Sequence, residues 1–331
     1  MVGRIRIVAT GGTIAGSAAD PADSTGYRAA TAGVEALVAS VPGLDALAEL
    51  SVEQFAQLDS ADMTDALALD LARRLQAIAE EPAVDGIVVT HGTDTLEDTA
   101  YLLHLVLDTA KPVVLVGAMR PPTALGADGP RNLRQAVLVA AHPASHGRGV
   151  LVVMDEEVHC ARDVTKAHPL GPGAFRSRYG PLGLLAGDRL GYYRAPERPH
   201  TVTSEFGIPE VLPRSGILTV HPGLTGPGLT GPGLPGGLDG LDALVLACPG
   251  NATVPTRLVA ELDAAWARGL AVVRASRAGT GAVTPIGAGA DAADRWLAVD
   301  DQSPGRARIL TALALTVTRD RDEVQRILYR Y

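Results

Sequence analysis

Two threonines stand where an apolar segment ends, and each has polar neighbours that could take part in chemistry. Thr13 follows the apolar segment Arg4–Thr10, and Thr93 and Asp94 follow the apolar segment Gly86–Thr90. A threonine hydroxyl is a weak nucleophile at neutral pH and needs a base or a proton relay beside it. The alternative interpretation is that each threonine only caps a turn or a helix.

Two further residues are candidates for the proton transfer that a threonine nucleophile needs. Lys166 ends the segment Arg162–Lys166, and a buried lysine can have its pKa lowered enough to act as a base. Tyr27 lies in a polar segment after Thr13, and such segments can form mobile lids. Taken alone, Lys166 fits a solvated surface lysine better, and Tyr27 fits an ordinary surface tyrosine equally well.

Two other apolar segments are followed by residues at the same predicted edge of the sheet. Ser60, preceded by Asp59, follows Leu50–Leu58, and Ala118 lies in Gly117–Pro122. Ligands of open α/β sheets bind outside the carboxyl ends of the strands, so these positions belong to one rim. For Ser60 the alternative is a helix N-cap.

Motifs for other chemistries are missing from the sequence. Gly11, Gly12 and Gly16 do not form GxGxxG, and the sequence has no GxxxxGK[ST] and no GxSxG. The histidines lack the spacing of zinc ligands. We therefore expect neither a metal nor a cofactor.

The order of apolar and amphipathic segments predicts an α/β fold. Strands alternate with helices up to about Val153, which is typical of a mostly parallel sheet flanked by helices. The expected strands are Arg4–Ala9, Leu50–Leu58, Gly86–Thr90, Pro112–Gly117 and Gly149–Val153. The expected helices are Val34–Val41, Asp65–Ile78, Leu96–Leu107 and Arg131–Ala141.

A smaller C-terminal α/β domain is expected after an irregular segment rich in proline and glycine. We place the larger, catalytic N-terminal domain at residues 1–192, a linker at 193–213 and the smaller domain at 214–331. Its expected elements are strands Gly216–Val220, Ala243–Leu246 and Ala271–Ala275 and helices Thr256–Arg268, Pro304–Thr316 and Asp322–Tyr329. A Gly/Pro repeat at 223–237 is expected to form a flexible surface loop.

The composition fits a globular protein with a small-molecule substrate. Hydrophobic residues make up 47% of the 331 residues, and no apolar run approaches the ~18 residues of a membrane span. The net charge of −8 argues against nucleic acid, because phosphate binding needs a basic face. Cys160 and Cys248 show no CxxC pattern, which favours two reduced thiols. With no signal peptide visible, we expect a cytoplasmic protein, unless a signal was trimmed.

Together these residues make the chain resemble the bacterial-type L-asparaginases, a family of Thr-dependent amidohydrolases. Two motifs carry the resemblance, ATGGTIA at Ala9–Ala15 and VTHGTDTLED at Val89–Asp98. Further agreement lies in Asp62–Met63, Gly117–Pro121, Ala127–Asn132, Arg162–Lys166, Val272–Arg277, Thr280–Gly281 and Ala307–Leu310. The resemblance covers almost the whole chain, in order.

The resemblance implies the roles of the catalytic residues. Thr13 matches the primary nucleophile and Tyr27 the lid tyrosine that assists it, while Thr93 matches a second threonine with Lys166 as its partner. The implied chemistry is attack on the side-chain amide, an acyl-enzyme ester, loss of ammonia and hydrolysis to aspartate. Which threonine performs which step stays open. Backbone N–H groups near both threonines are expected to hold the oxyanion.

The resemblance also implies how substrate is held. Asp94 matches the carboxylate that binds the α-ammonium of the substrate. Ser60, with Asp59 beside it, matches the residue that binds the α-carboxylate. The Ala118 carbonyl matches a group that contacts the side-chain amide. The family uses no cofactor and is usually a homotetramer, a dimer of dimers, with each site at the contact between two subunits.

Two departures from the well-studied secreted members bear on affinity. They carry Gln after the matching serine, where this chain has Ala61, as the cytoplasmic members do. They also supply a Glu from the neighbouring subunit to the substrate ammonium, whereas the matching stretch here has no acid before Asp291. Losing a charged hydrogen bond costs roughly 1.5–3 kcal/mol. We therefore expect a weaker KM for asparagine than in those members.

Three alternatives remain to be tested against asparagine hydrolysis. The nearest is a glutaminase-asparaginase or a hydrolase of another small amide. The second is a subunit of the archaeal amidotransferase that converts Glu-tRNA to Gln-tRNA. Such subunits carry an extra domain before their first Thr motif, whereas Thr13 here stands almost at the start of the sequence. The acidic net charge also argues against this class. A non-catalytic binding protein is disfavoured because all five candidate catalytic residues are retained.

Overall fold

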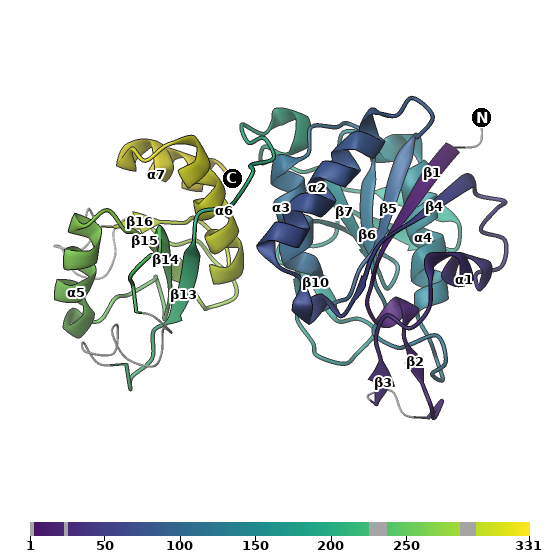
Figure 1. The fold of residues 1–331 in the computed structure, drawn as a ribbon, viewed down its shortest axis with the longest axis horizontal. Coiled ribbons are helices and arrows are strands. Elements are labelled where there is room, and N and C mark those ends of the chain that lie inside the picture. Colours follow the sequence, from purple (N-terminus) through teal and green to yellow (C-terminus); the bar gives the residue numbers. More distant parts are fainter. Residues whose placement is uncertain (1–2, 23–25, 225–236, 285–295) are drawn as a thin grey trace. The chain divides into compact units, whose positions relative to one another are not determined.

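The chain folds into two compact units, Met1–Ile208 and Pro209–Tyr331 (Figure 1). The computed structural model describes residues 3–22, 26–224, 237–284 and 296–331. The division falls inside the segment 193–213 that the sequence predicts as a linker. The prediction of a larger α/β domain followed by a smaller one is confirmed.

An eight-stranded sheet forms the centre of the first unit, in the order β12-β11-β8-β7-β6-β5-β1-β4. Its five parallel strands are β1 (Gly3–Gly11), β4 (Ala48–Leu58), β5 (Gly86–Thr90), β6 (Val113–Val116) and β7 (Val150–Met154). The antiparallel strands β8 (Glu157–Cys160), β11 (Gly183–Ala186) and β12 (Arg189–Tyr192) extend it at one edge. All five parallel strands coincide with segments that the sequence predicts.

Helices cover both faces of this sheet. Figure 1 shows α2 (Asp65–Glu80) and α3 (Leu96–Val106) on one face and α1 (Val34–Ala39) and α4 (Gly129–Ala141) on the other. The central strands are therefore buried on both faces, and every residue of β5 is buried. Because helices cover both faces, the sequence of β5 is a continuous run of apolar residues without alternating polar ones.

Two pairs of short antiparallel strands carry candidate site residues. The strands β2 (Ser17–Ala18) and β3 (Tyr27–Arg28) pair with each other and place Tyr27. The strands β9 (Val164–Lys166) and β10 (Phe175–Ser177) pair likewise and place Lys166. The sequence does not predict these strands individually, because they are only two or three residues long.

The second unit contains a four-stranded parallel sheet in the order β13-β14-β15-β16. Its strands are β13 (Ser215–Thr219), β14 (Ala243–Cys248), β15 (Ala271–Ser276) and β16 (Leu297–Ala298), and its helices are α5 (Thr256–Ala267), α6 (Pro304–Val317) and α7 (Arg321–Arg330). Cys248 here and Cys160 in the first unit are buried free thiols. Burial raises the pKa of the Cys248 thiol to about 12.

Some sequence-based predictions fall where the structure gives no description. Most of the Gly/Pro repeat, residues 225–236, and Asp291 lie outside the described residues. Within the described ranges, no helix is both long and apolar enough to cross a membrane.

Candidate active site

Thr13 lies directly after β1, and its hydroxyl contacts that of Tyr27. Gly11 and Gly12 have φ values of 110° and 82°, a left-handed conformation that glycine adopts without steric cost. Thr13 Oγ1 and the Tyr27 hydroxyl oxygen are 2.7 Å apart, and either can donate. The short 3-10 helix Thr13–Ala15 is preceded by Gly12 as its N-cap, so the Thr13 hydroxyl is not a helix cap.

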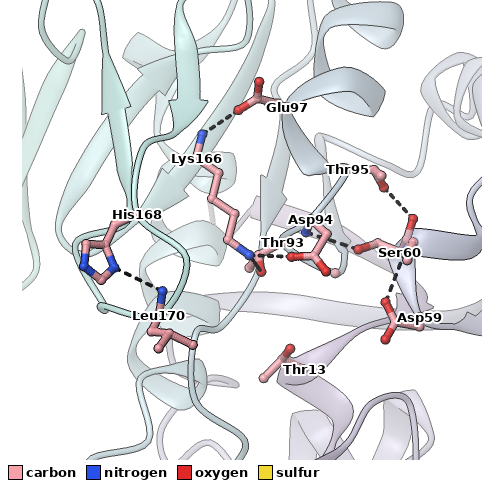
Figure 2. A network of polar contacts seen from close by, with 12 residues as sticks. Thr13, Asp59, Ser60, Thr93, Asp94, Thr95, Glu97, Lys166, His168 and Leu170 are labelled. Carbon is pink, nitrogen blue, oxygen red and sulfur yellow. Dashed lines mark hydrogen bonds and ion pairs between the residues drawn. The ribbon is translucent and has the colours of Figure 1, made fainter. Parts of the chain in front are cut away.

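Thr93, Asp94 and Lys166 form a single polar cluster at the end of β5. Lys166 Nζ donates to Thr93 Oγ1 at 2.9 Å and to Asp94 Oδ1 at 2.5 Å. The Lys166 side chain is 15% exposed, whereas that of Asp94 is 60% exposed. Lys166 is therefore not a solvated surface lysine, and Figure 2 shows Thr13 facing this cluster from the β1 loop.

The backbone of Lys166 is held by the first turn of α3. The Lys166 N–H donates to Glu97 Oε2 at 2.5 Å, as Figure 2 shows. Because Glu97 stands three residues after Asp94, the same chain segment contacts both ends of the lysine. Glu97 thus fixes β9 relative to the loop that carries Thr93.

Ser60 is buried and joins the β4 loop to the β5 loop. Its Oγ accepts the Asp94 N–H at 3.2 Å, and its carbonyl accepts the Thr95 hydroxyl at 2.8 Å. Asp59 is the N-cap of the short helix that follows, because its carboxylate accepts the Ala61 N–H at 3.1 Å. The N-cap interpretation of Ser60 is therefore wrong, and the cap is Asp59.

Glycines let these loops approach one another. A Cβ built on Gly92 would meet Ser60 Oγ at 2.5 Å, and one on Gly117 would meet Thr93 Cγ2 at 2.9 Å. Such short contacts exclude any side chain at these two positions. The ends of β4, β5 and β6 consequently pack against one another around Thr93.

Ala118 follows β6, in the loop that begins with Gly117. The residue is fully buried, and its methyl group lies 3.3 Å from the Cβ position of Gly129. A contact between its carbonyl and a substrate therefore requires that the groups covering it move.

His91 stands between Thr90 and Gly92 and is completely buried. Its Nδ1 lies 2.8 Å from the Gly92 carbonyl oxygen, which fixes the proton on Nδ1 in the neutral ring. Desolvation lowers the pKa of His91 to about 4. His91 is thus neutral near pH 7 and adds no charge beside Asp94 and Lys166.

All eight predicted site residues lie in the first unit, and the structure brings six of them into direct polar contact in two groups. The pair Thr13–Tyr27 forms one group, and Ser60, Thr93, Asp94 and Lys166 form the other. Among the described residues, no group of three or more His, Cys, Asp or Glu side chains is arranged to hold a metal ion.

Sequence reasoning missed four residues that organise the site. Thr95 and Glu97 lie inside the motif around Thr93. Asp128 and Asn132 lie inside another matching segment and bond the Ala118 loop. Their presence in motifs of the resemblance was the available signal. The partners of Thr95 and Glu97 lie 35 and 69 residues away, and those of Asp128 and Asn132 lie across a loop, so spacing alone does not identify them.

Comparison with known families finds matches over both units. Residues 4–198 match the family described as "Asparaginase, N-terminal". Residues 217–328 match the "Glutaminase/Asparaginase C-terminal domain".

Individual relatives cover nearly the whole chain. "L-asparaginase 2" of Escherichia coli (strain K12) is 42% identical over 330 residues, which are 99% of this chain and 93% of the relative. "Glutaminase-asparaginase" of Pseudomonas aeruginosa is 40% identical over 327 residues, 98% of this chain and 90% of the relative. The crystal structure of a "Probable Cytoplasmic L-asparaginase" from Campylobacter jejuni is similar at a TM-score of 0.92, with 36% identity, and covers 99% of this chain and 100% of that one.

Proposed function

The chain belongs to the asparaginase family, and from that premise we propose that it is an L-asparaginase. It hydrolyses the side-chain amide of L-asparagine to L-aspartate and ammonia. One observation carries the proposal: both threonine hydroxyls contact a proton-bearing partner, Thr13 with Tyr27 and Thr93 with Lys166.

Catalysis begins with attack of a threonine hydroxyl on the amide carbon. The hydroxyl proton leaves to its partner, the oxygen bonds to carbon, and the amide nitrogen departs as ammonia after it takes up a proton. Water then attacks the resulting ester and releases the threonine and aspartate. For Thr93 the proton path runs through Lys166, whose Nζ donates both to Thr93 Oγ1 and to Asp94 Oδ1. Lys166 first passes one proton to Asp94 Oδ1, and the neutral amine then takes the proton of Thr93 Oγ1.

Thr13 is the proposed nucleophile for the first attack, with Tyr27 as its proton partner. Thr93 with Lys166 is the alternative nucleophile or the pair that activates the water. The Asp94 N–H already donates to Ser60 Oγ. The N–H groups of Thr13 and Thr93 are therefore the candidates for binding the oxyanion.

Charged groups of the substrate are bound by Asp94 and Ser60. The Asp94 side chain is 60% exposed while its Oδ1 accepts from Lys166, so its Oδ2 is the atom we assign to the α-ammonium. The Ser60 oxygen accepts the Asp94 N–H, and its own O–H can donate to the α-carboxylate. Asp59 holds the Ser60 turn through the Ala61 N–H.

A glutaminase-asparaginase is the second candidate, because one of the similar proteins bears that name. Ammonia release from asparagine and from glutamine, measured side by side on one preparation, separates the two. Rapid release from asparagine alone supports the asparaginase, and comparable rates support the broader activity. No release from either substrate contradicts the proposal.

The proposal includes a homotetramer, a dimer of dimers, as is usual in this family. Light scattering after size exclusion tests it, with an expected mass of about four times the 34.2 kDa of one chain. We also propose a cytoplasmic location, which agrees with the name of the Campylobacter jejuni protein. Activity in the cytoplasmic fraction of the source cells supports this location, and activity confined to a secreted fraction contradicts it.

A further inference from the structure

We propose that Asp128 and Asn132 are positioning residues that aim the Ala118 carbonyl at the amide nitrogen of the substrate. The inference rests on the proposed asparaginase function. It assigns to these two side chains the preference for an amide over other carbonyl derivatives of aspartate.

Asp128 fixes the loop on the far side of Ala118. Its carboxylate accepts the Met119 N–H at 3.0 and 3.2 Å and the Arg120 N–H at 2.9 Å. Backbone N–H groups that converge on a carboxylate form charge-assisted hydrogen bonds, which are stronger than neutral ones. The two residues that follow Ala118 are therefore held by a single side chain.

The hydrogen bonds of Asp128 differ from those expected for a residue at the start of a helix. Asp128 is the N-cap of α4, where an aspartate ordinarily accepts an N–H from the first turn of its own helix. Here the carboxylate makes no such capping bond. It reaches instead to a loop eight and nine residues earlier in the chain, which points to a role in that loop rather than in the helix.

Asn132 fixes the loop on the near side of Ala118. It is buried on α4, and its Nδ2 donates to the Gly117 carbonyl and to Asp128 Oδ2, both at 3.0 Å. Its Oδ1 accepts the Asp155 N–H at 3.3 Å. The side chain therefore ties the Gly117 peptide, the Asp128 carboxylate and the turn after β7 together.

Ala118 is thus the one residue between two held peptide groups. Gly117 is fixed through its carbonyl and Met119 through its N–H, so these two side chains set the orientation of the Ala118 carbonyl. The residue is buried, so the groups that cover the carbonyl must move aside while Asp128 and Asn132 keep its orientation. A carbonyl accepts from the N–H of an amide but has nothing to accept from an ester oxygen. This orientation of the Ala118 carbonyl therefore favours reaction of the amide substrate and does not affect reaction of an ester.

The test compares L-asparagine with the β-methyl ester of L-aspartate, which offers the same acyl group without an N–H. Two variants disturb the arrangement: Asp128→Asn turns a donor toward the loop, and Asn132→Leu keeps the shape without hydrogen bonds. Each is expected to lower kcat/KM for asparagine by roughly tenfold or more and kcat/KM for the ester by less than about threefold. Val137→Ala, in the core side of α4, is the control and should leave the amide-to-ester ratio unchanged.

Hydrogen exchange of the Met119 and Arg120 amides supplies a readout independent of turnover. Both amides should exchange faster in Asp128→Asn than in the parent protein and not in Val137→Ala. Equal losses on the amide and the ester in both variants, or unchanged exchange, overturn the inference. If the parent protein hydrolyses the ester but releases no ammonia from asparagine, the proposed function fails instead.

Discussion

The backbone of Gly12 packs against the backbone of Gly92. A Cβ on Gly12 would lie 2.4 Å from Gly92 Cα and 2.5 Å from Gly92 N, so no side chain fits between the two loops. Each glycine directly precedes a candidate catalytic threonine, Thr13 and Thr93. The contact therefore sets how closely the β1 and β5 loops bring the two hydroxyls.

Gly12→Ala should separate the two loops and abolish most activity. The new methyl group must push backbone away from backbone, and a misplacement of about 1 Å can cost roughly 100-fold in rate. Gly43→Ala is the matched control, because Gly43 also has a positive φ, 69°, but nothing lies within 4 Å of its Cβ position. We expect Gly43→Ala to lose about 1 kcal/mol of stability and keep its kcat. Equal kcat values in the two variants contradict the role of the contact.

Lys166→Met should remove the proton path of Thr93 while leaving the fold intact. We expect kcat to fall by roughly 100-fold or more, the range for loss of a general acid–base group. The chain offers a control in its only other lysine, Lys111, whose Nζ donates to the Glu81 carbonyl. Lys111→Met should keep kcat within about twofold, because this hydrogen bond involves none of the candidate site residues. A Lys166→Met variant with parental kcat would remove Lys166 from the mechanism.

Replacing each threonine in turn assigns the covalent step. Thr13→Ala should prevent the acyl-enzyme, whereas Thr93→Ala should allow it to form and persist if Thr93 serves the water step. Mass spectrometry of protein quenched with asparagine detects the added aspartyl group on the peptide that bears it. An adduct on Thr93 in the Thr13→Ala variant reverses the assignment. Full activity in both variants shows that neither hydroxyl is catalytic.

The parallel core of the first unit could be predicted because its strands are buried on both faces and leave continuous apolar runs, as in Gly86–Thr90. The hairpin that holds Lys166 could not be predicted. Its strands β9 and β10 are three residues each, and pairing between them leaves no periodicity that a window of sequence can detect.

The candidate residues could be named from sequence, but their contacts could not. Asp94 and Lys166 are 72 residues apart in the sequence, yet Lys166 Nζ lies 2.5 Å from Asp94 Oδ1. Only the folded structure shows this contact. For Ser60 the sequence leaves two interpretations open, because a serine directly after a strand can be a binding residue or a helix N-cap. The structure decides the point, since the cap is the preceding Asp59.

Acid should destabilise the protein through its buried histidines. Burial lowers the pKa of His91 and that of His159 to about 4 in the folded state, against 6.5 for an ordinary histidine. Between pH 6.5 and 4 the unfolded chain therefore binds more protons, so stability is full above pH 6.5 and falls as pH drops toward 4. Each histidine contributes on the order of 3 kcal/mol at most.

Urea unfolding at pH 7 and pH 4.5 measures this loss. His159→Gln should lose less stability between the two pH values than the parent protein, although Glu157, 3.4 Å from His159 Nε2, offsets part of the effect. His146→Gln, at an exposed position, is the control and should behave as the parent. A parental pH dependence in His159→Gln means that His159 is not the cause.

Ala61→Gln should lower the KM for asparagine. The family resemblance places Ala61 where the secreted asparaginases are expected to carry glutamine. Ala61 is exposed and follows Ser60, the residue proposed to bind the α-carboxylate. A glutamine amide there can add one hydrogen bond to a charged group, worth roughly 1.5–3 kcal/mol before ordering costs, so KM should fall by about tenfold at unchanged kcat. Ala66→Gln, exposed on the first turn of α2, adds the same side chain outside the loop and should leave KM as it is. A parental KM already in the low micromolar range contradicts the expected weaker KM, and a KM that Ala61→Gln does not change contradicts the role given to this position.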